Sequence, residues 1–382
     1  MNRIKVAHLV LGLGKSGAET MLYQIIKYRT SMAPEYKVIS LGLSHYYEKK
    51  IREQGVKVVE ITDTNRLRRI KKTITIIRSE VRDADIICSW LYIANALAFF
   101  LRRPNQRIIW CVRHSDISFR NNSLKTFFLS RACSLLSKGV HVIAYNGNRA
   151  RQIHESIGYK PKMSVVLDNG VEIDEYTNNT EKGKSIKRQL EIDDRLKVIL
   201  SVARNNKIKD LPTFVKMFSL VHKMDKKTVA IMCGSGIDKD NGELVDLCSQ
   251  LGLNIDRDIF LLGFCEDVSA LMNTADVYVL HSRGEAFPNT LIQAMSCGKP
   301  VVSTDVGDVR AIIGDERFVV EVGDYNQLAQ RVYNVINMDK EEIDVLSKTN
   351  RDRIVQNYNI KMIVKEYEKV FHYEAEYNNP TR

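Results

Sequence analysis

HSRGEAFPNTLIQAMSCGKP, residues 281–300, lies between two short apolar runs, Val277–Leu280 and Val301–Thr304. Two such runs separated by one helical segment predict a β-α-β unit with parallel strands. We expect residues 284–289 to form its loop and 290–296 its helix. Ligands of open α/β sheets bind at the carboxyl ends of the strands, so this loop is a candidate binding loop.

Apolar runs of strand length recur along the whole chain, and segments of helical period separate them. In the first half they cover residues 5–11, 37–41, 56–61, 85–88, 107–112, 142–144 and 164–167; in the second half they cover 197–202, 228–233, 259–262, 277–280, 300–304 and 318–320. This alternation predicts an α/β protein with two doubly wound parallel sheets.

The polar segment 169–187, rich in Asn, Thr, Lys and Glu, suits a connection between two domains. We therefore predict one Rossmann-like domain over residues 1–170 and a second over 171–360. The tail, 341–373, has a helical pattern. A cleft between two such domains is a natural place for a two-substrate site.

Length and composition agree with two ordinary domains. The chain has 382 residues, of which 44 % are hydrophobic, enough to bury two cores. Its seven cysteines include no C-x-x-C pair, so we expect no disulfide framework or zinc cluster and a reducing cytoplasm. The apolar run at the start is short and is expected to be a strand rather than a signal peptide. No run of about eighteen apolar residues predicts a membrane span.

Positive charge is concentrated in the first half. Residues 1–170 hold 29 Lys and Arg against 12 Asp and Glu, a balance of +17, which leaves 11 − 17 = −6 for the remainder. Basic residues gather on one predicted helix and after the apolar run 97–101: Arg66, Arg68, Arg69, Lys71, Lys72, Arg78, Arg102 and Arg103. Such a surface attracts anionic lipid head groups or phosphate-linked carriers. Solvated helix faces are the alternative explanation, and the absence of a zinc-finger or aromatic-basic motif argues against nucleic acid.

The first predicted loop, GLGKSGAET, resembles two phosphate-binding motifs without completing either. A Walker A motif needs a glycine where Leu9 stands, and the dinucleotide fingerprint lacks its acidic residue near 40–44. We therefore predict neither an ATP site nor a dehydrogenase. Gly17 remains a position where backbone can approach a phosphate or an acceptor.

Two cations follow the first strand of the second domain. Arg204 and Lys209 stand five residues apart in one loop, where they could clamp a diphosphate and replace a metal ion, or could simply be solvated. Gly234 and Gly236 would form the next loop. No Asp-x-Asp motif ends a strand, so we expect no metal.

The stretch Glu285-Ala-Phe-Pro-Asn-Thr-Leu-Ile-Gln293-Ala-Met-Ser-Cys-Gly298-Lys-Pro300 resembles the signature of the retaining glycosyltransferases of family 4, the group 1 type, which have the two-domain GT-B fold. Further blocks stand in that family's order: residues 11–20, 113–114, 168–171, 204–209, 234–236 and 305–308. The similarity runs from about residue 5 to residue 367. It implies two Rossmann-like domains facing a central cleft, with the last helix, 361–382, crossing back toward the first domain.

Two positions depart from the family pattern. The second glutamate of the signature is Gln293 here, and Ser16-Gly17 stands where the first loop usually has paired glycines. By resemblance, residue 293 binds the ribose hydroxyls of the donor. An amide still donates and accepts hydrogen bonds there but lacks charge assistance, so the substitution affects donor affinity more than fold.

The resemblance implies roles for the remaining candidates. Arg204 and Lys209 would stabilise the departing diphosphate, Glu285 would orient the donor sugar, and His114 would approach the sugar from the first domain. Donor contacts are expected from Gly17, Gly234, Gly236, Ala286, Phe287, Pro288, Asn289 and Gln293, and acceptor contacts from Arg113, Trp90 and Asn95, although core packing of the aromatic residues is an equal expectation. His8 and His281, at or beside apolar strands, are expected to serve packing and local hydrogen bonds.

We therefore expect a retaining, metal-independent transfer of a sugar from a nucleotide-diphosphate donor, expected to be UDP-linked, to a glycan or lipid-linked acceptor in cell-surface polysaccharide synthesis. No cofactor is expected, and the chain is expected on the inner face of the membrane. The alternatives are a nucleotide-sugar epimerase or phosphorylase of the same fold, and a degenerate protein that binds glycans or serves as a scaffold without turnover.

Overall fold

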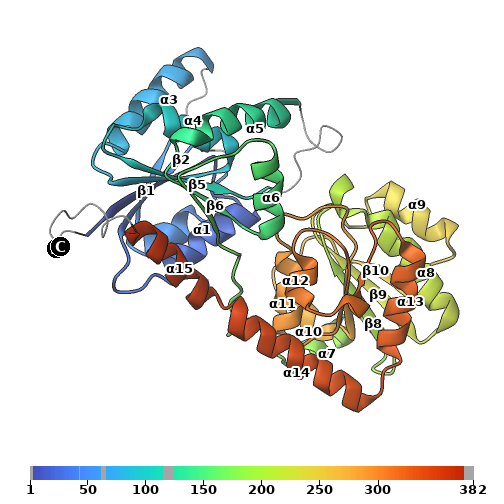
Figure 1. Ribbon diagram of the computed structural model, residues 1–382. Helices are drawn as coiled ribbons and strands as arrows, with labels where there is room; N and C mark the ends of the chain where they lie inside the picture. The colour runs from blue at the N-terminus through green and yellow to red at the C-terminus, as the bar shows by residue number, and fades with distance from the viewer. Residues whose placement is uncertain (1–2, 43, 62–65, 115–123, 374–382) are drawn as a thin grey trace. The chain divides into compact units, whose positions relative to one another are not determined.

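The computed structural model describes residues 3–42, 44–61, 66–114 and 124–373, and for 66–70 the backbone alone. The chain forms two compact units (Figure 1). Unit 1 comprises residues 1–170 and 360–382, and unit 2 comprises residues 171–359. Among the described residues, no helix combines the length and the apolar character needed to cross a membrane.

Unit 1 is built on a seven-stranded parallel sheet within its described residues, in the order β3-β2-β1-β4-β5-β6-β7. Its strands are β1 (Lys5–Val10), β2 (Glu35–Ser40), β3 (Lys57–Glu60), β4 (Ile86–Trp90), β5 (Arg107–Val112), β6 (Val142–Tyr145) and β7 (Met163–Val166). Its helices are α1 (Gly17–Lys27), α2 (Glu48–Glu53), α3 (Arg66–Glu80), α4 (Leu91–Leu101), α5 (Leu124–Leu136), η1 (Ser137–Gly139), α6 (Asn148–Ser156) and α15 (Ile360–His372).

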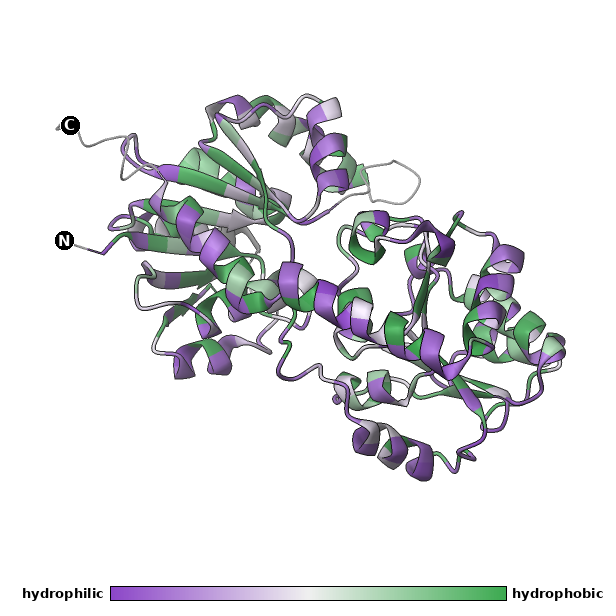
Figure 2. Ribbon diagram, turned by 60° about the horizontal axis from the view of Figure 1, so that its bottom comes forward, coloured by the Kyte–Doolittle hydropathy of each residue, from purple (hydrophilic) through white to green (hydrophobic). Residues whose placement is uncertain are grey.

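Both faces of this sheet are buried, because helices cover each of them and successive strand residues point to opposite sides. In β1, Val6 and Val10 join the core formed with α1 and α15, while Ala7 and Leu9 join the core formed with α3 and α4. The helices are correspondingly amphipathic, and hydrophilic and hydrophobic residues alternate along them (Figure 2).

Unit 2 repeats the architecture with a six-stranded parallel sheet among its residues, in the order β10-β9-β8-β11-β12-β13. Its strands are β8 (Lys197–Val202), β9 (Thr228–Cys233), β10 (Ile259–Leu261), β11 (Val277–Leu280), β12 (Val301–Thr304) and β13 (Val319–Val320). Its helices are α7 (Thr180–Gln189), η2 (Lys207–Lys209), α8 (Leu211–Met224), α9 (Gly242–Gln250), α10 (Val268–Thr274), α11 (Asn289–Ser296), α12 (Val309–Ile313), η3 (Glu316–Phe318), α13 (Tyr325–Ile336) and α14 (Lys340–Asn357).

Short polar side chains begin many of the unit 2 helices. Asn179, Asn241, Asp267 and Asp324 each accept a hydrogen bond from a backbone N–H of the first turn. Asp339 and Glu342 form a full capping box at α14. These caps satisfy N–H groups that have no partner inside the helix, so the sequence sets where these helices start.

The predicted strands are confirmed as parallel strands, with ends that differ by one or two residues. The β-α-β unit of the signature is confirmed as β11, α11 and β12, although Asn289 is the first residue of the helix and not the last of the loop. The helical tail is interrupted at residues 358–359, so α14 stays with unit 2 while α15 belongs to unit 1.

Helix α15 is attached to unit 1 by polar as well as apolar contacts. Glu368, 6 % exposed, accepts hydrogen bonds from the backbone N–H and the hydroxyl of Thr30 at 2.8 and 2.6 Å. Arg107 of β5 donates to the carbonyl of Phe371 at 3.0 Å, and the Phe371 ring packs edge-on against His8. The end of the described chain is thereby part of the core of unit 1.

Replacing Glu368 by alanine is expected to destabilise unit 1 by about 1–3 kcal/mol, because two part-buried donors of Thr30 lose their acceptor. Thermal unfolding followed by circular dichroism measures the loss. Glu366→Ala, on the exposed side of the same helix, breaks only a surface ion pair with Lys369 and should cost less than about 1 kcal/mol. Equal effects of the two substitutions would contradict the anchoring role of Glu368.

Candidate active site

The strand order of unit 2 creates a switch point between β8 and β11. These strands are neighbours, yet the chain continues from β8 toward β9 and β10 on one side and from β11 toward β12 and β13 on the other. The loops that leave them, residues 203–210 and 281–288, therefore diverge at the carboxyl edge of the sheet. Open α/β sheets bind ligands at this place.

Two of the predicted residues meet there. The Lys209 ammonium lies 2.5 Å from the Glu285 carboxylate, whose same oxygen also accepts a hydrogen bond from the Ser282 hydroxyl at 2.6 Å. The Glu285 side chain is 9 % exposed. A carboxylate held by two donors has a fixed orientation, which suits recognition of sugar hydroxyls.

Asp210 ties the two loops together. It adopts a left-handed backbone with φ of 51°, and its carboxylate accepts from the guanidinium of Arg283 and the hydroxyl of Thr213, both at 2.8 Å. The backbone N–H of Arg283 donates to the carbonyl of Ile208 at 2.7 Å. The loop of Lys209 is thus fastened to the loop of Glu285 by groups that the sequence analysis did not identify.

His281 is buried beneath these two loops and contacts both β8 and Asp210. It contacts the Ser201 hydroxyl through Nε2 at 2.6 Å and the carbonyl of Asp210 through Nδ1 at 3.2 Å, and packs on Phe214. Burial lowers the pKa of His281 to about 4, so the ring is neutral near pH 7. The expected packing and hydrogen-bonding role of His281 is confirmed.

Gly234 and Gly236 let the loop after β9 approach the loop that carries Arg204. A Cβ on Gly234 would lie 1.6 Å from the carbonyl oxygen of Ala203, and a Cβ on Gly236 would lie 2.9 Å from the Cβ of the Asn205 side chain. Both glycines have positive φ. A hydrogen bond from the N–H of Asn205 to the carbonyl of Ser235 joins the loops. Arg204 itself is exposed, and the structure records no hydrogen bond or ion pair for its side chain within the described residues.

The signature loop passes directly into α11. Phe287 is buried and packs against Tyr358, Pro288 precedes the helix, and Asn289 is its first residue. Ala286 and Gln293 are half-buried, and no hydrogen bond is recorded for the Gln293 side chain over the described ranges.

The loop after β12 lies against the loop that carries Glu285. Gly307 has a φ of 55°, and a Cβ at this position would lie 2.8 Å from the carbonyl oxygen of Glu285. The loop at 305–308 therefore passes close to the backbone of Glu285.

In unit 1, the candidates gather at the carboxyl edge of the sheet. Gly17 is the exposed first residue of α1 after β1, and His114 is a half-buried residue just beyond β5, with its ring 6.3 Å from that of Tyr92. Residues 115–123, which follow His114, lie outside the described residues. The edge thus offers one backbone approach at Gly17 and one imidazole at His114.

The three predicted acceptor residues are placed in the interior of unit 1. Arg113 is 9 % exposed, donates to Asn169 Oδ1 at 2.6 Å and lies over the rings of Trp90 and Tyr367, and burial lowers its pKa. Trp90 is 1 % exposed, and Asn95 is fully buried beside Ser89. This placement supports packing for Trp90 and Asn95 and leaves their predicted acceptor role without support.

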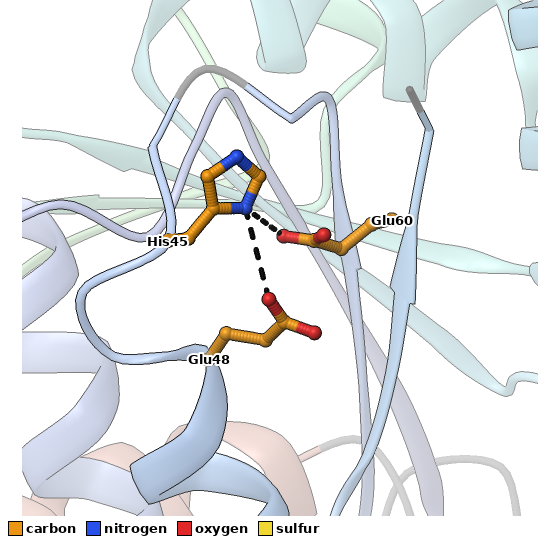
Figure 3. A group of neighbouring side chains, drawn as sticks. All are labelled: His45, Glu48 and Glu60. Carbon is orange, nitrogen blue, oxygen red and sulfur yellow. Dashed lines mark hydrogen bonds and ion pairs between the residues drawn. The ribbon is translucent and has the colours of Figure 1, made fainter. Parts of the chain in front are cut away.

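One further group has the composition of a metal site (Figure 3). His45 Nδ1 lies 2.6 Å from Glu60 and 3.7 Å from Glu48, and the three potential ligand atoms lie within 4.8 Å of one another. The imidazole already bonds Glu60, and Arg52 donates twice to Glu48 at 3.0 and 2.9 Å. Protein partners therefore account for this cluster, of which only His45 is exposed, without a cation.

Comparison with known proteins agrees with this geometry. Two α/β domains, each built on a parallel sheet, define the GT-B architecture, and the expected fold class is confirmed. Residues 183–353, most of unit 2, match the family model of the glycosyl transferases group 1, which confirms the resemblance over this part of the chain.

Curated relatives are similar over part of their length. An N-acetyl-alpha-D-glucosaminyl L-malate synthase of Bacillus anthracis is 25 % identical over 49 % of this chain and 48 % of its own. An N-acetylgalactosamine-N,N'-diacetylbacillosaminyl-diphospho-undecaprenol 4-alpha-N-acetylgalactosaminyltransferase of Campylobacter jejuni is 28 % identical over 65 % of each chain. The chain thus spans between about half and two thirds of these relatives.

Solved structures show the likeness in fold over nearly the whole chain. Anabaena Alr3699/HepE in complex with UDP and glucose has a TM-score of 0.82 at 19 % identity and covers 97 % of this chain and 100 % of its own. A glycosyltransferase from Rickettsia africae has a TM-score of 0.83 at 17 % identity and covers 99 % and 100 %.

Gly234→Ala is expected to destabilise unit 2 on the order of 3 kcal/mol, because the new methyl group collides with the Ala203 carbonyl in a backbone conformation that L residues rarely adopt. Differential scanning calorimetry measures the shift. Gly242→Ala is the matched control, since a Cβ there meets no atom within 4 Å, and its effect should stay within about 1 kcal/mol. An unchanged melting temperature for Gly234→Ala would show that the two loops do not require this contact.

Proposed function

We propose that the protein is a retaining glycosyltransferase that moves a sugar from a nucleotide diphosphate, UDP in the first instance, to a glycan or lipid-linked acceptor in polysaccharide or glycoconjugate synthesis. The observation that carries the proposal is the Lys209–Glu285 pair at the switch point of the sheet that matches the group 1 family. The donor would bind mainly to unit 2 and the acceptor to the basic unit 1, at the inner face of the membrane.

The residues of the loop after β8 suit the departure of a diphosphate. Arg204 is exposed and cationic, and Lys209 supplies a second cationic side chain five residues further along the same loop. Two cations in one loop can neutralise the charge that develops on the leaving group. In other enzymes a metal ion has this role. We accordingly propose transfer without a metal or other cofactor.

Glu285 would orient the sugar, because its carboxylate is already held by Lys209 and Ser282. As transfer proceeds, the bond from the anomeric carbon to the diphosphate breaks, the acceptor hydroxyl oxygen bonds to that carbon, and the hydroxyl proton passes to the departing diphosphate. His114, at the carboxyl edge of unit 1, would contribute a hydrogen bond to the sugar. Retention of configuration is supported by the family resemblance alone.

Names of similar proteins support the choice of substrates. The Anabaena structures are described as complexes with UDP, UDP-glucose, and UDP with glucose. Two relatives are named as transferases acting on diphosphoundecaprenol-linked sugars, from Campylobacter jejuni and Escherichia coli. A UDP-linked donor and a lipid-linked acceptor are therefore the first substrates to test.

Gln293 favours a second candidate, a protein that binds nucleotide sugar or glycan without turnover. The amide stands at a position where the family signature has a carboxylate, and the structure leaves it half-buried on α11. Loss of a charge-assisted contact to the donor could weaken binding enough to abolish transfer. Slow release of nucleotide diphosphate from the donor without acceptor distinguishes a transferase from such a binding protein.

Thermal stabilisation by UDP and UDP-sugars tests the donor site. A ligand at about 100 times its dissociation constant adds about 2.7 kcal/mol to the stability of the native state. We expect such stabilisation in the wild type and its loss in Arg204→Ala and Lys209→Ala, because each substitution removes a proposed phosphate contact. Glu285→Gln should retain the effect of UDP and lose the additional effect of the sugar.

Lys207→Ala is the matched control, since Lys207 is an exposed lysine in the same loop and should leave the nucleotide response unchanged. A response to UDP that persists in both Arg204→Ala and Lys209→Ala would show that the diphosphate does not bind at this loop. The absence of any response to a panel of nucleotides would overturn the proposed function.

Gln293→Glu is expected to bind the nucleotide more tightly by about fivefold, since a carboxylate makes the stronger hydrogen bonds to ribose hydroxyls. Isothermal titration calorimetry with UDP measures the change. Gln250→Glu, which adds the same charge on the exposed side of α9, controls for the change in net charge. Equal or weaker binding by Gln293→Glu would place the ribose elsewhere.

A further inference from the structure

Helix α5 of unit 1 exposes large apolar side chains along one line. Leu124, Phe128 and Leu135 are 57 %, 66 % and 76 % exposed. Their spacings of four and seven residues place them within about 40° of one another around an α-helix. We call these three residues the α5 stripe. Single exposed apolar residues are ordinary on protein surfaces, whereas several large ones aligned on one helix are typical of an interaction site.

The neighbouring helix adds to this surface. Helices α4 and α5 lie side by side over the same face of the sheet (Figure 1), and Phe100, near the end of α4, is 66 % exposed. The end of α4 lies against the turn that follows α5, since Arg102 donates to the carbonyl of Gly139 at 2.8 Å. The apolar surface thus extends beyond a single helix.

Basic residues accompany the apolar ones. Arg131 occupies the same line of α5 as the α5 stripe, and its guanidinium lies 5.5 Å from the ring of Phe127. Together with the others on α5 and η1 and after α4, these residues form what we call the basic rim: Arg102, Arg103, Lys125, Arg131 and Lys138.

Negative charge is almost lacking in this part of the sequence. From Ile86 to Gly139 the chain contains one acidic residue, Asp116, which lies outside the described residues, against eight basic ones: Arg102, Arg103, Arg107, Arg113, Arg120, Lys125, Arg131 and Lys138. The described residues of α4, α5 and η1 include no carboxylate. The basic rim therefore meets no counter-charge from its own helices.

We propose that the α5 stripe, with Phe100 and the basic rim, docks unit 1 on an anionic lipid bilayer. Helices that lie in the interface between lipid and water bury leucine and phenylalanine among the acyl chains and direct lysine and arginine to the head groups. Charge decides between the possible occupants of this surface. A second copy of the chain would bring one basic rim against another, while anionic head groups supply the opposite charge.

This inference deepens the proposed function. A surface-bound unit 1 would meet a lipid-linked acceptor at the bilayer and would need no membrane-spanning helix. The binding also involves two additive signals, apolar insertion and electrostatic attraction, and each can be removed separately. Neither signal depends on the donor site in unit 2.

Co-sedimentation of the full chain with phosphatidylcholine vesicles, with and without phosphatidylglycerol, tests the proposal. The wild type should bind the anionic vesicles, more weakly at high salt. The triple variant Leu124→Gln, Phe128→Gln, Leu135→Gln should bind them at least about tenfold more weakly, because the inserted apolar area is lost. The triple variant Lys125→Gln, Arg131→Gln, Lys138→Gln should lose binding by at least about tenfold on anionic vesicles through its missing charges.

A matched control exchanges exposed apolar residues of unit 2 for the same amide: Met224→Gln, Phe264→Gln and Val345→Gln, at positions 45 %, 59 % and 62 % exposed. Its vesicle binding should equal that of the wild type. Unchanged binding by both α5 variants would overturn the proposal. Concentration-dependent dimers of the wild type without lipid, lost in the α5 stripe variant, would assign the surface to a second copy instead.

Thermal stabilisation by UDP, measured on the same variants, separates this inference from the proposed function. The α5 variants should respond to UDP as the wild type does, which also shows that they are folded. Loss of vesicle binding with an intact UDP response supports the docking surface. If the wild type binds vesicles but responds to no nucleotide, the proposed transferase function is overturned and the proposed docking surface is retained.

Discussion

The ion pair between Asp210 and Arg283 joins the two loops on which the candidate site of unit 2 depends. Because β8 and β11 are neighbours from which the chain departs in opposite directions, their loops diverge unless something holds them. Asp210 does so with a buried carboxylate at the start of α8, and the backbone bond from Arg283 to Ile208 adds a second tie. Lys209 and Glu285 are then brought within 2.5 Å. The site is a consequence of this junction.

Gly234 and Gly307 allow neighbouring loops to pack closely at the same edge of the sheet. Gly234 lies where any side chain would meet the Ala203 carbonyl, and Gly307 lies where a side chain would meet the Glu285 carbonyl. The loop after β9 therefore packs closely on the loop after β8, which carries Lys209, and the loop after β12 packs closely on the loop after β11, which carries Glu285. Such packing fixes the position of charged groups before a ligand arrives, which is the condition for electrostatic stabilisation of a leaving group. Unit 1 contributes a different property, an apolar and basic face on α4 and α5.

Much of this could be predicted from the sequence, for physical reasons that differ between elements. The strands were predictable because parallel strands buried on both faces are continuous apolar runs, as in Val277–Leu280. The two loops that carry Lys209 and Glu285 could be predicted because each directly follows an apolar strand. Asp210 could not be predicted, because its left-handed backbone and its partner 73 residues away leave no local signal. Trp90 is the last residue of β4 and Asn95 lies in α4 directly after it, and both are buried, although nothing in the local sequence pattern says which side of the sheet edge a residue faces.

By itself, the sequence determined the α/β class, the two parallel sheets, the basic character of the first half and the loops at which charged residues would stand, because periodicity, capping and composition are local properties. Only the tertiary structure decided which charged residues meet. Lys209 and Glu285 are 76 residues apart, and their contact depends on β8 and β11 being neighbours in the sheet. It also decided which apolar residues remain outside the core, since Leu124, Phe128 and Leu135 have the composition of core residues and are exposed only because α5 packs through its opposite face.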